Sequence, residues 1–491
     1  MNVLERNPFE YLEKEQVFRQ LVKIFGKPYV SDKAHDLYPY SYDSTESDAH
    51  MPHFVVLPEK VQEIVDLVNF CHRYKIPIVP YATGNNVGGL TIPQQGGITC
   101  DMGKRMKSII KIHESMMYAL IEPGVTWGQL KKYLEVHHPQ LKYGYTYAPP
   151  YASVLANTLL SGMSNLSTAH GCMADWLNGL EAVLYTGEIV RTGSAFLSKE
   201  LNTDNWFCRY PVPDLSGLFM CWQGMTGIVT KVAVQLWPKK KFNTVLVALV
   251  YGAKECATLV KEFGRSECCE DVSAMNIEII KMTFGQENPP KYEKEPDFGI
   301  IISASAPTQA LLEAKVDYLQ QIFQKVEKKS DKVMKLTNFS TFVNLLGESF
   351  KIYHDLPTVI TPMVEYSGVT WVGCYGSTDQ TGVLFEKCSR VFKDHQREPL
   401  IFMKSMKDSH YCAFMAISRY KFPKELPIVR KLQKEFLELM LAHNCIPYKT
   451  PLWMTERIRQ SCDPTWLKLL ETIKNAMDPH RIFNPGRWGL Y

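Results

Sequence analysis

The pattern of apolar and polar residues divides the chain into helical and extended segments. Between Val61 and Cys71 the apolar side chains recur at the spacing of one helix face, which predicts an amphipathic helix. The next apolar segment, Ile76 to Pro80, predicts a short strand that runs into a loop of small residues, Tyr81 to Gly89. Further β-type segments are expected at 97–101, 118–122, 181–184, 189–192 and 228–237.

The pattern changes after Lys241. A strand is expected at 244–250 and a helix from Ala253, followed by a long mixed region that is typical of an α+β domain. The last helix of this region is expected at 425–443. Another helix at 465–477 and a turn signal at Asp478-Pro479 precede the end of the chain. We interpret residues 241–447 as a domain inserted between residues 1–240 and a returning segment, 448–491.

Length and composition fit a globular protein of two or three domains. The chain has 491 residues, of which 45% are hydrophobic and 22% charged, so each domain can bury an apolar core. The net charge of +4 is small, and the only short basic run is Lys239-Lys240-Lys241. These values argue against a nucleic-acid partner and leave anionic small molecules open.

Targeting and metal-binding signals are not visible. The N-terminus has no apolar signal region, and the longest apolar stretch, Val245 to Tyr251, is too short to cross a bilayer, so we expect a cytoplasmic protein without a membrane span. The thirteen cysteines include no Cys-x-x-Cys pair and no metal-ligand spacing. We therefore expect mostly buried thiols and no metal site.

The loop from Thr83 to Gly89 is the sharpest local signal for chemistry. A run of small residues after a strand lets successive backbone N–H groups approach a diphosphate, although an ordinary glycine-rich turn explains the same pattern. The loop does not fit the dinucleotide pattern G-x-G-x-x-G or the phosphate loop that ends in Lys-Ser or Lys-Thr. Nucleotide binding by those two routes is disfavoured.

Several segments in register resemble one flavoprotein family. They include His53 to Pro58, the loop at Gly84, Asp101 to Met106, Glu122 to Trp127, Ser153 to Ser164, Gly179 to Val183, Thr186 to Glu188, Gly217 to Thr230, and Asp478 to Gly489. The chain resembles the FAD-linked oxidoreductases of the vanillyl alcohol oxidase and p-cresol methylhydroxylase type, a family that also includes glycolate and D-lactate dehydrogenases and alkyl-dihydroxyacetonephosphate synthase. The resemblance spans nearly the whole chain.

The resemblance implies an α+β fold, with a two-lobed FAD-binding domain of the p-cresol methylhydroxylase type and an inserted α+β cap domain that has an antiparallel sheet and binds the substrate. It also implies FAD as the cofactor. The loop is expected to cradle the FAD diphosphate, and the other segments to line the adenosine, ribityl chain and flavin. Singly, Ser161 also fits a helix cap and His170 a hydrogen-bonded core histidine. The cofactor-binding residues expected are Pro80, Tyr81, Ala82, Thr83, Gly84, Asn85, Asn86, Val87, Gly88, Gly89, Pro123, Gly124, Ser153, Asn157, Ser161, Gly162, His170, Gly171, Gly227, Ile228, Val229 and Arg487.

Three residues are candidates for catalysis: Tyr448, Lys449 and His410. Tyr448-Lys449-Thr450 resembles the Tyr-Arg-Thr with which the vanillyl alcohol oxidase branch holds a phenolate, and a lysine keeps the charge without the planar fork. Alternatively, Lys449 pairs with Glu456. His410 resembles in position the histidine beside the flavin in the 2-hydroxy-acid dehydrogenases, and its alternative is a strand-end histidine satisfied by backbone.

The implied activity is FAD-dependent oxidation of an alcohol or benzylic carbon, such as that of a 4-alkylphenol or 4-hydroxybenzyl substrate, by hydride transfer to flavin N5. The alternatives are a lactate- or glycolate-type 2-hydroxy-acid dehydrogenase, and a non-redox flavoprotein like alkyl-dihydroxyacetonephosphate synthase. We expect a small-molecule substrate with an anionic or phenolic group, and a homo-oligomer such as a dimer. The electron acceptor stays open between oxygen, a cytochrome and an electron-transfer flavoprotein.

Overall fold

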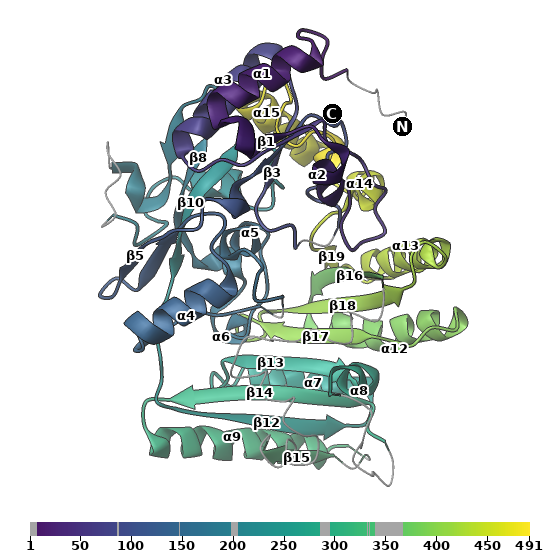
Figure 1. The fold of residues 1–491 in the computed structure, drawn as a ribbon. Helices are drawn as coiled ribbons and strands as arrows, with labels where there is room; N and C mark the ends of the chain where they lie inside the picture. The colour runs from purple at the N-terminus through teal and green to yellow at the C-terminus, as the bar shows by residue number, and fades with distance from the viewer. Residues whose placement is uncertain are drawn as a thin grey trace.

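The computed structural model describes residues 7–85, 88–146, 148–197, 205–284, 295–330, 332, 334–338 and 367–491. Two bodies are visible (Figure 1). The upper body contains the N-terminal half of the chain and the C-terminal helices, and the lower body contains one broad sheet with helices packed on it. Mixed helices and sheets in this arrangement confirm the expected α+β class. The numerical domain boundaries stay a prediction.

A four-stranded sheet with helices α1, α2 and α3 forms the top of the molecule (Figure 1). Its order is β1-β2-β4-β3, in which β2 and β3 run parallel to β4 and β1 runs antiparallel to β2. Leu21, Val68 and Ile98 are fully buried in the shared core. The structure confirms the helix predicted from Val61. The elements here are α1 (Lys14–Phe25), β1 (Val30–Ser31), α2 (Ala34–Leu37), β2 (Phe54–Val56), α3 (Val61–Tyr74), β3 (Ile78–Tyr81) and β4 (Ile98–Asp101).

A five-stranded antiparallel sheet of order β5-β6-β10-β8-β9 completes the N-terminal half. The buried rings of Trp127 and Trp176 pack with it in a second core. A separate two-stranded ladder joins β7 to β11. The elements are β5 (Ile109–His113), β6 (Tyr118–Ile121), α4 (Trp127–His137), β7 (Leu141–Lys142), α5 (Val154–Leu159), α6 (Ser167–His170), β8 (Leu177–Val183), β9 (Ile189–Arg191), β10 (Ile228–Gln235) and β11 (Trp237–Pro238).

The lower body contains an eight-stranded sheet of order β15-β12-β14-β13-β17-β18-β16-β19, in which every paired strand is antiparallel. Residues of α7, α9, α12 and α13 share one core with it, whereas residues of α8 belong to a cluster with Val247 and Phe402. The elements are β12 (Phe242–Val250), α7 (Ala253–Gly264), β13 (Asp271–Asn276), α8 (Ile277–Phe284), β14 (Phe298–Ala306), α9 (Gln309–Glu327), β15 (Lys335–Asn338), β16 (Gly368–Gly376), α12 (Thr378–Asp394), β17 (Ile401–Met406), β18 (Tyr411–Tyr420), α13 (Leu426–Ala442) and β19 (Ile446–Pro447). The expected antiparallel sheet is confirmed.

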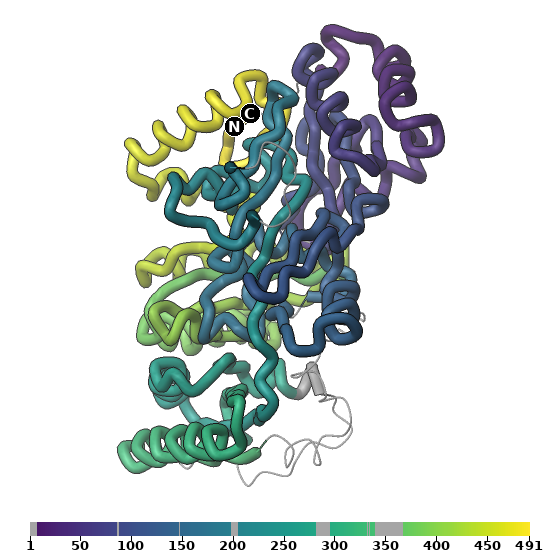
Figure 2. The backbone as a smooth tube through the Cα atoms, turned by 90° about the vertical axis from the view of Figure 1, so that its left-hand side faces the viewer, coloured from purple at the N-terminus to yellow at the C-terminus, as the bar shows by residue number. Residues whose placement is uncertain are grey.

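The C-terminal segment returns to the upper body, which contains α14 (Leu452–Arg459) and α15 (Pro464–Met477) (Figures 1 and 2). Beyond α15 the backbone joins the edge of β3: the amide of Ile78 donates to the carbonyl of Ile482 at 2.7 Å, and the amide of Asn484 donates to the carbonyl of Ile78 at 2.8 Å. The last residues of the chain therefore lie beside the loop that follows β3.

Helix α6 fastens the two bodies together. The side-chain hydroxyl of Thr168 donates to the carbonyl of Ser405 in β17 at 3.0 Å and accepts from the amide of Val272 in β13 at 2.8 Å. The amides of Lys407 and Asp408, in the turn after β17, donate to carbonyls of α6. The broad sheet is thus hydrogen-bonded to the body that carries the glycine-rich loop. Within the described ranges, no helix has the length and apolar character needed to cross a membrane.

Candidate active site

A pocket opens where the glycine-rich loop, helix α5 and the segment before β10 meet. Its lining combines most of the loop with residues from the far end of the chain, which the return of the C-terminal segment to β3 explains. It is lined by Pro80, Tyr81, Ala82, Thr83, Gly84, Asn85, Leu90, Thr91, Met102, Ala152, Ser153, Leu155, Ala156, Asn157, Leu159, Leu160, Phe219, Gln223, Gly224, Thr226, Gly227, Val229, Lys449 and Asn484.

The loop needs glycine where it turns. Gly84 has a φ of +71°, and a Cβ on it would lie 1.9 Å from the Tyr81 hydroxyl oxygen. Gly89 has a φ of +68°, a Cβ there would lie 2.5 Å from the Ser47 hydroxyl oxygen, and its amide donates to Asp43 at 2.8 Å. A Cβ at either position would overlap these neighbouring atoms on a backbone that L side chains rarely adopt, so both positions require glycine. Asn86 and Val87, also expected at the cofactor, lie outside the described residues.

Ser153 joins three segments of the pocket. Its amide donates to the Thr83 hydroxyl at 3.0 Å, its hydroxyl donates to the carbonyl of Pro123 at 2.6 Å, and the same hydroxyl accepts from the amide of Ala156 in the first turn of α5. Pro123 and Gly124 themselves do not line the pocket. A Cβ on Gly124 would lie 2.6 Å from the carbonyl oxygen of Met106, so this glycine permits a close backbone approach behind the loop.

Two buried polar atoms near the pocket have no hydrogen-bond partner among the described residues: the Gln223 Oε1 acceptor and the Arg487 Nη1 donor. Gln223 lines the pocket. The fully buried Arg487 donates to the carbonyl of Ile92 at 2.7 Å and to Asn484, which lines the pocket, at 3.3 Å. Unsatisfied buried groups are costly unless a ligand completes them. A bare glycine loop together with these two atoms fits the polar cofactor FAD.

Lys449 extends into the pocket from the C-terminal side. The ammonium nitrogen lies 5.6 Å from the ring centroid of Trp371 and 5.8 Å from that of Tyr448. Burial lowers the pKa of Lys449 to about 8, although Cys221 opposes the shift. No carboxylate among the described residues pairs with Lys449, and Glu456 does not reach it. The aromatic faces compensate only part of the desolvation, so the site favours an anion beside Lys449.

Tyr448 and Tyr375 form the aromatic wall next to Lys449. The amide of Tyr448 donates to the carbonyl of Gly373 at 3.1 Å, and a Cβ on Gly373 would lie 2.2 Å from the Tyr448 ring, so this glycine makes room for the phenol. The rings of Tyr448 and Tyr375 lie 5.2 Å apart, and the Tyr448 hydroxyl donates to the Met415 sulfur at 3.1 Å. Burial raises the pKa of both phenols, which therefore stay neutral.

His410 is not brought into this pocket. It lies exposed in the turn before β18, where its amide donates to the carbonyl of Lys407. The next residue, Tyr411, instead contacts the aromatic wall, with its ring centroid 5.2 Å from that of Tyr375. Tyr448 and Lys449 therefore lie together, whereas His410 is separate from them.

The residues expected near the flavin divide into two groups. Gly227 and Val229 line the pocket, but Ile228 is fully buried in the core behind it. Ser161, Gly162, His170 and Gly171 are not among the lining residues. The His170 ring stacks on Trp237 at 4.7 Å and 14°. Ser161 has a φ of +55°, and its hydroxyl donates to the Cys172 sulfur at 2.9 Å. The carbonyl of Ser161 accepts a hydrogen bond from the Tyr375 hydroxyl.

Sequence reasoning missed the strand β16 residues that contact Lys449 or its neighbour Tyr448. Trp371, Gly373 and Tyr375 alternate along β16 and so share one face of the sheet. That period-two pattern of aromatic and small residues was a readable signal. Gln223 and Asn484 carry no comparable signal. The described residues contain no group of three or more His, Cys, Asp or Glu side chains that is suited to a metal ion.

Comparisons with known proteins agree with this geometry. Residues 52–193 match the FAD binding domain family. Over 98% of this chain and 96% of the relative, the sequence is 25% identical to the 4-cresol dehydrogenase [hydroxylating] flavoprotein subunit of Pseudomonas putida. Over half of each chain it is 30% identical to the glycolate oxidase subunit GlcD of Bacillus subtilis.

The fold is shared with a solved p-cresol methylhydroxylase. The two superpose with a TM-score of 0.84 over 97% of this chain and 96% of the other, at 20% sequence identity. The matched domain and the full-length likeness confirm FAD as the cofactor and redox catalysis as the kind of activity. The chain thus contains an FAD binding domain and, over nearly its whole length, is similar to flavoproteins of the p-cresol methylhydroxylase and vanillyl alcohol oxidase type.

Proposed function

We propose that this enzyme oxidises an alcohol or benzylic carbon of a small substrate that has a phenolic or otherwise anionic head group. The observation that carries the proposal is Lys449, which lines the pocket and whose ammonium group lies 5.6 Å from the Trp371 ring and 5.8 Å from the Tyr448 ring without a carboxylate partner among the described residues. Bound FAD supplies the hydride acceptor.

The cofactor is proposed to be held by the loop of Pro80 to Gly89 together with Ser153, Asn157 and Gly227. Thr83 and Ser153 fix the loop against α5 through the hydrogen bond between them. The bare backbone at Gly84 in the pocket lining admits a diphosphate, Gly89 lets the loop turn against Ser47, and Arg487 orients Asn484 at the same wall.

Lys449 is proposed to fix the head group and to favour its ionised form. A cation in a partly desolvated site lowers the pKa of a bound phenol, and the phenolate donates electron density through the ring to the benzylic carbon at its para position, from which the hydride leaves. The rings of Trp371 and Tyr448 lie within 6 Å of the ammonium group and shield it from water, and Tyr375 packs against Tyr448 behind them. The name of the Pseudomonas relative, 4-cresol dehydrogenase, supports a phenolic substrate.

A 2-hydroxy acid is the second candidate substrate. The same ammonium group fits a carboxylate, and the glycolate oxidase and D-lactate dehydrogenase relatives support this class. The aromatic wall favours the phenolic class because a short hydroxy acid leaves the ring faces without contact.

The test is anaerobic mixing of the FAD-loaded enzyme with 4-alkylphenols, 4-hydroxybenzyl alcohol, D-lactate and glycolate while the flavin absorbance is followed. We expect bleaching by the phenolic compounds. Bleaching by the hydroxy acids alone selects the second candidate, and no bleaching by any compound contradicts both and favours a non-redox role of the flavin.

A further inference from the structure

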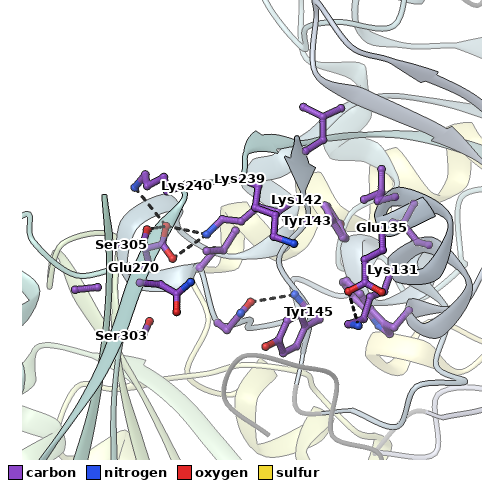
Figure 3. A pocket seen from close by; sticks show the side chains of 18 residues that line it. Lys131, Glu135, Lys142, Tyr143, Tyr145, Lys239, Lys240, Glu270, Ser303 and Ser305 are labelled. Atoms are coloured by element: carbon purple, nitrogen blue, oxygen red, sulfur yellow. Dashed lines mark hydrogen bonds and ion pairs between the residues drawn. The ribbon is translucent and has the colours of Figure 1, made fainter. Parts of the chain in front are cut away.

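A second cavity, of about 180 Å³, lies between α4 and β7 of the upper body and β14 of the broad sheet (Figure 3). Its lining shares no residue with the pocket that contains Lys449. Both bodies contribute: Trp127, Leu130 and Lys142 come from the upper body, and Glu270 and Ser305 from the lower one. The cavity is therefore separate from the proposed oxidation site.

One wall of the cavity has an excess of positive charge. The Lys142 ammonium donates to both carboxylate oxygens of Glu270 at 2.8 Å, and Lys240 reaches the same carboxylate at 3.3 Å (Figure 3). These lysines and the Ser305 hydroxyl lower the pKa of Glu270 to about 2 although burial opposes the shift. Glu270 is therefore always charged, but one carboxylate faces two ammonium groups. Lys239 also lines the cavity and has no ion-pair partner among the described residues.

Repulsion from the neighbouring lysines contributes to a lowered pKa of Lys142. Burial lowers its pKa, and Lys240 and Lys239 lower it further, although Glu270 opposes them. An additional anion at this wall would relieve that repulsion, and each lysine has further N–H donors to offer it.

The opposite wall is apolar and aromatic. Trp127 is 2% exposed, and its ring stacks on that of Tyr143 at 5.1 Å and 18°. The side chains of Leu130, Leu134 and Leu166 also line the cavity, and the Lys131–Glu135 ion pair of α4 lies on the same side (Figure 3). The indole Nε1 of Trp127 is buried without a hydrogen-bond partner among the described residues. An apolar cavity of about 150 Å³ accepts a benzene ring, so this space is large enough for one ring with a small polar group.

We propose that this cavity binds an aromatic monocarboxylate of about the size of benzoate. The ring packs against Trp127 and the leucines, and the carboxylate meets Lys142, Lys239 and Lys240. A neutral aromatic molecule would not neutralise the excess positive charge of the lysines, and inorganic phosphate would make no contact with the aromatic wall.

The experiment is calorimetric titration of the FAD-loaded enzyme with benzoate, with the flavin spectrum recorded in parallel. Benzoate that enters the flavin pocket changes the flavin absorbance. Binding at the inferred site is therefore seen as a saturable heat signal without an absorbance change, the silent component. We expect a Kd of about 1 mM for it, which is ordinary for so small a ligand. We expect the double variant K239M/K240M to weaken this component at least about tenfold, because it removes two charged contacts. Lys241→Met is the matched control, since Lys241 belongs to the same run but does not line the cavity, and it should leave the component unchanged.

A second variant tests the location. Asn243 is an exposed rim residue, and Asn243→Trp should fill the cavity and abolish the silent component while FAD content stays at the wild-type level. The proposal is overturned if no silent component is found, if it survives both K239M/K240M and N243W, or if benzyl alcohol or inorganic phosphate binds there as tightly as benzoate. These outcomes are independent of flavin reduction and so of the proposed function.

Discussion

Lys449 shows how one side chain changes its chemistry with burial. Its backbone has a φ of +54°, in the left-handed region that non-glycine residues seldom adopt, and this conformation directs the chain away from β19 at the pocket. An arginine here would stay charged at every accessible pH, whereas a lysine titrates.

The pH dependence of substrate binding follows. Because burial lowers the pKa of Lys449 to about 8, the ammonium form is present below that pH and is lost as the pH rises through it. We expect the KM for an anionic substrate to rise about tenfold per pH unit above about 8. Lys449→Arg keeps the positive charge at these pH values, so the rise of KM above about pH 8 should disappear in this variant. A wild-type KM that stays constant up to about pH 9.5, while flavin is still reduced, would contradict Lys449 as the recognising cation.

Gly89 tests the diphosphate loop at the same scale. Gly89→Ala places a Cβ 2.5 Å from the Ser47 hydroxyl oxygen on a backbone with positive φ, and we expect FAD affinity to fall about tenfold or more, measured by reconstitution of the apoprotein. Gly217→Ala is the matched control, since its nearest contact would be an ordinary 3.5 Å from Asp214. Equal FAD affinity in the two variants would remove the loop from the cofactor site.

Residues were predictable where short segments carry them. Tyr448 and Lys449 lie in one tripeptide, and the loop of Pro80 to Asn85 is continuous, so a resemblance carried by short segments was enough to group them. Trp371 reaches Lys449 only through the pairing of β16 with β19, which joins residues about seventy positions apart. His410 was expected at the pocket but lies outside it, whereas the adjacent residue, Tyr411, reaches the aromatic wall. Neighbouring residues at the start of a strand point to opposite faces, so an error of one position reverses the expected contact.

At the scale of elements, the contact between α6 and the broad sheet depends on Thr168. Thr168→Val removes a buried donor and leaves the amide of Val272 unsatisfied, so we expect the free energy of unfolding to fall by about 1–3 kcal/mol, measured by denaturant titration. The control Thr472→Val alters an exposed hydroxyl that bonds only within α15 and should change stability by less than about 0.5 kcal/mol. A similar loss of unfolding free energy in both variants would show that the Thr168 hydrogen bonds do not specifically stabilise the contact between the two bodies.

Periodicity predicted the elements whose burial is one-sided. Helices α3 and α13 were expected within three residues of their observed ends, because each buries one apolar stripe. Helix α15 was expected within one residue of its ends although it buries only Leu470 and Lys474, because stop and turn signals follow it in the sequence. Strand β13 has no such signal: all six of its residues are buried, polar ones included, and its partner β17 follows about 130 residues later. Strand order in the broad sheet is a property of these distant pairings.

For the whole molecule, electron flow is expected to begin and end at the flavin. The sequence has no dinucleotide fingerprint, and the described residues hold no metal cluster. We therefore expect NADH and NADPH not to reduce the flavin at useful rates in a stopped-flow trace, with dithionite as the positive control. Rapid stoichiometric reduction by NADH would contradict this. The electron acceptor and the homo-oligomeric state stay predictions.

The central claim is that the Lys449 pocket oxidises a substrate through its anionic head group. The most direct measurement compares anaerobic flavin reduction by 4-hydroxybenzyl alcohol and by benzyl alcohol in the wild type, Lys449→Arg and Lys449→Met. We expect the preference for the hydroxylated substrate to fall at least about tenfold in Lys449→Met and to persist in Lys449→Arg, because a charge-assisted contact is lost only in the first. An unchanged preference in Lys449→Met, with FAD content intact, would contradict the account.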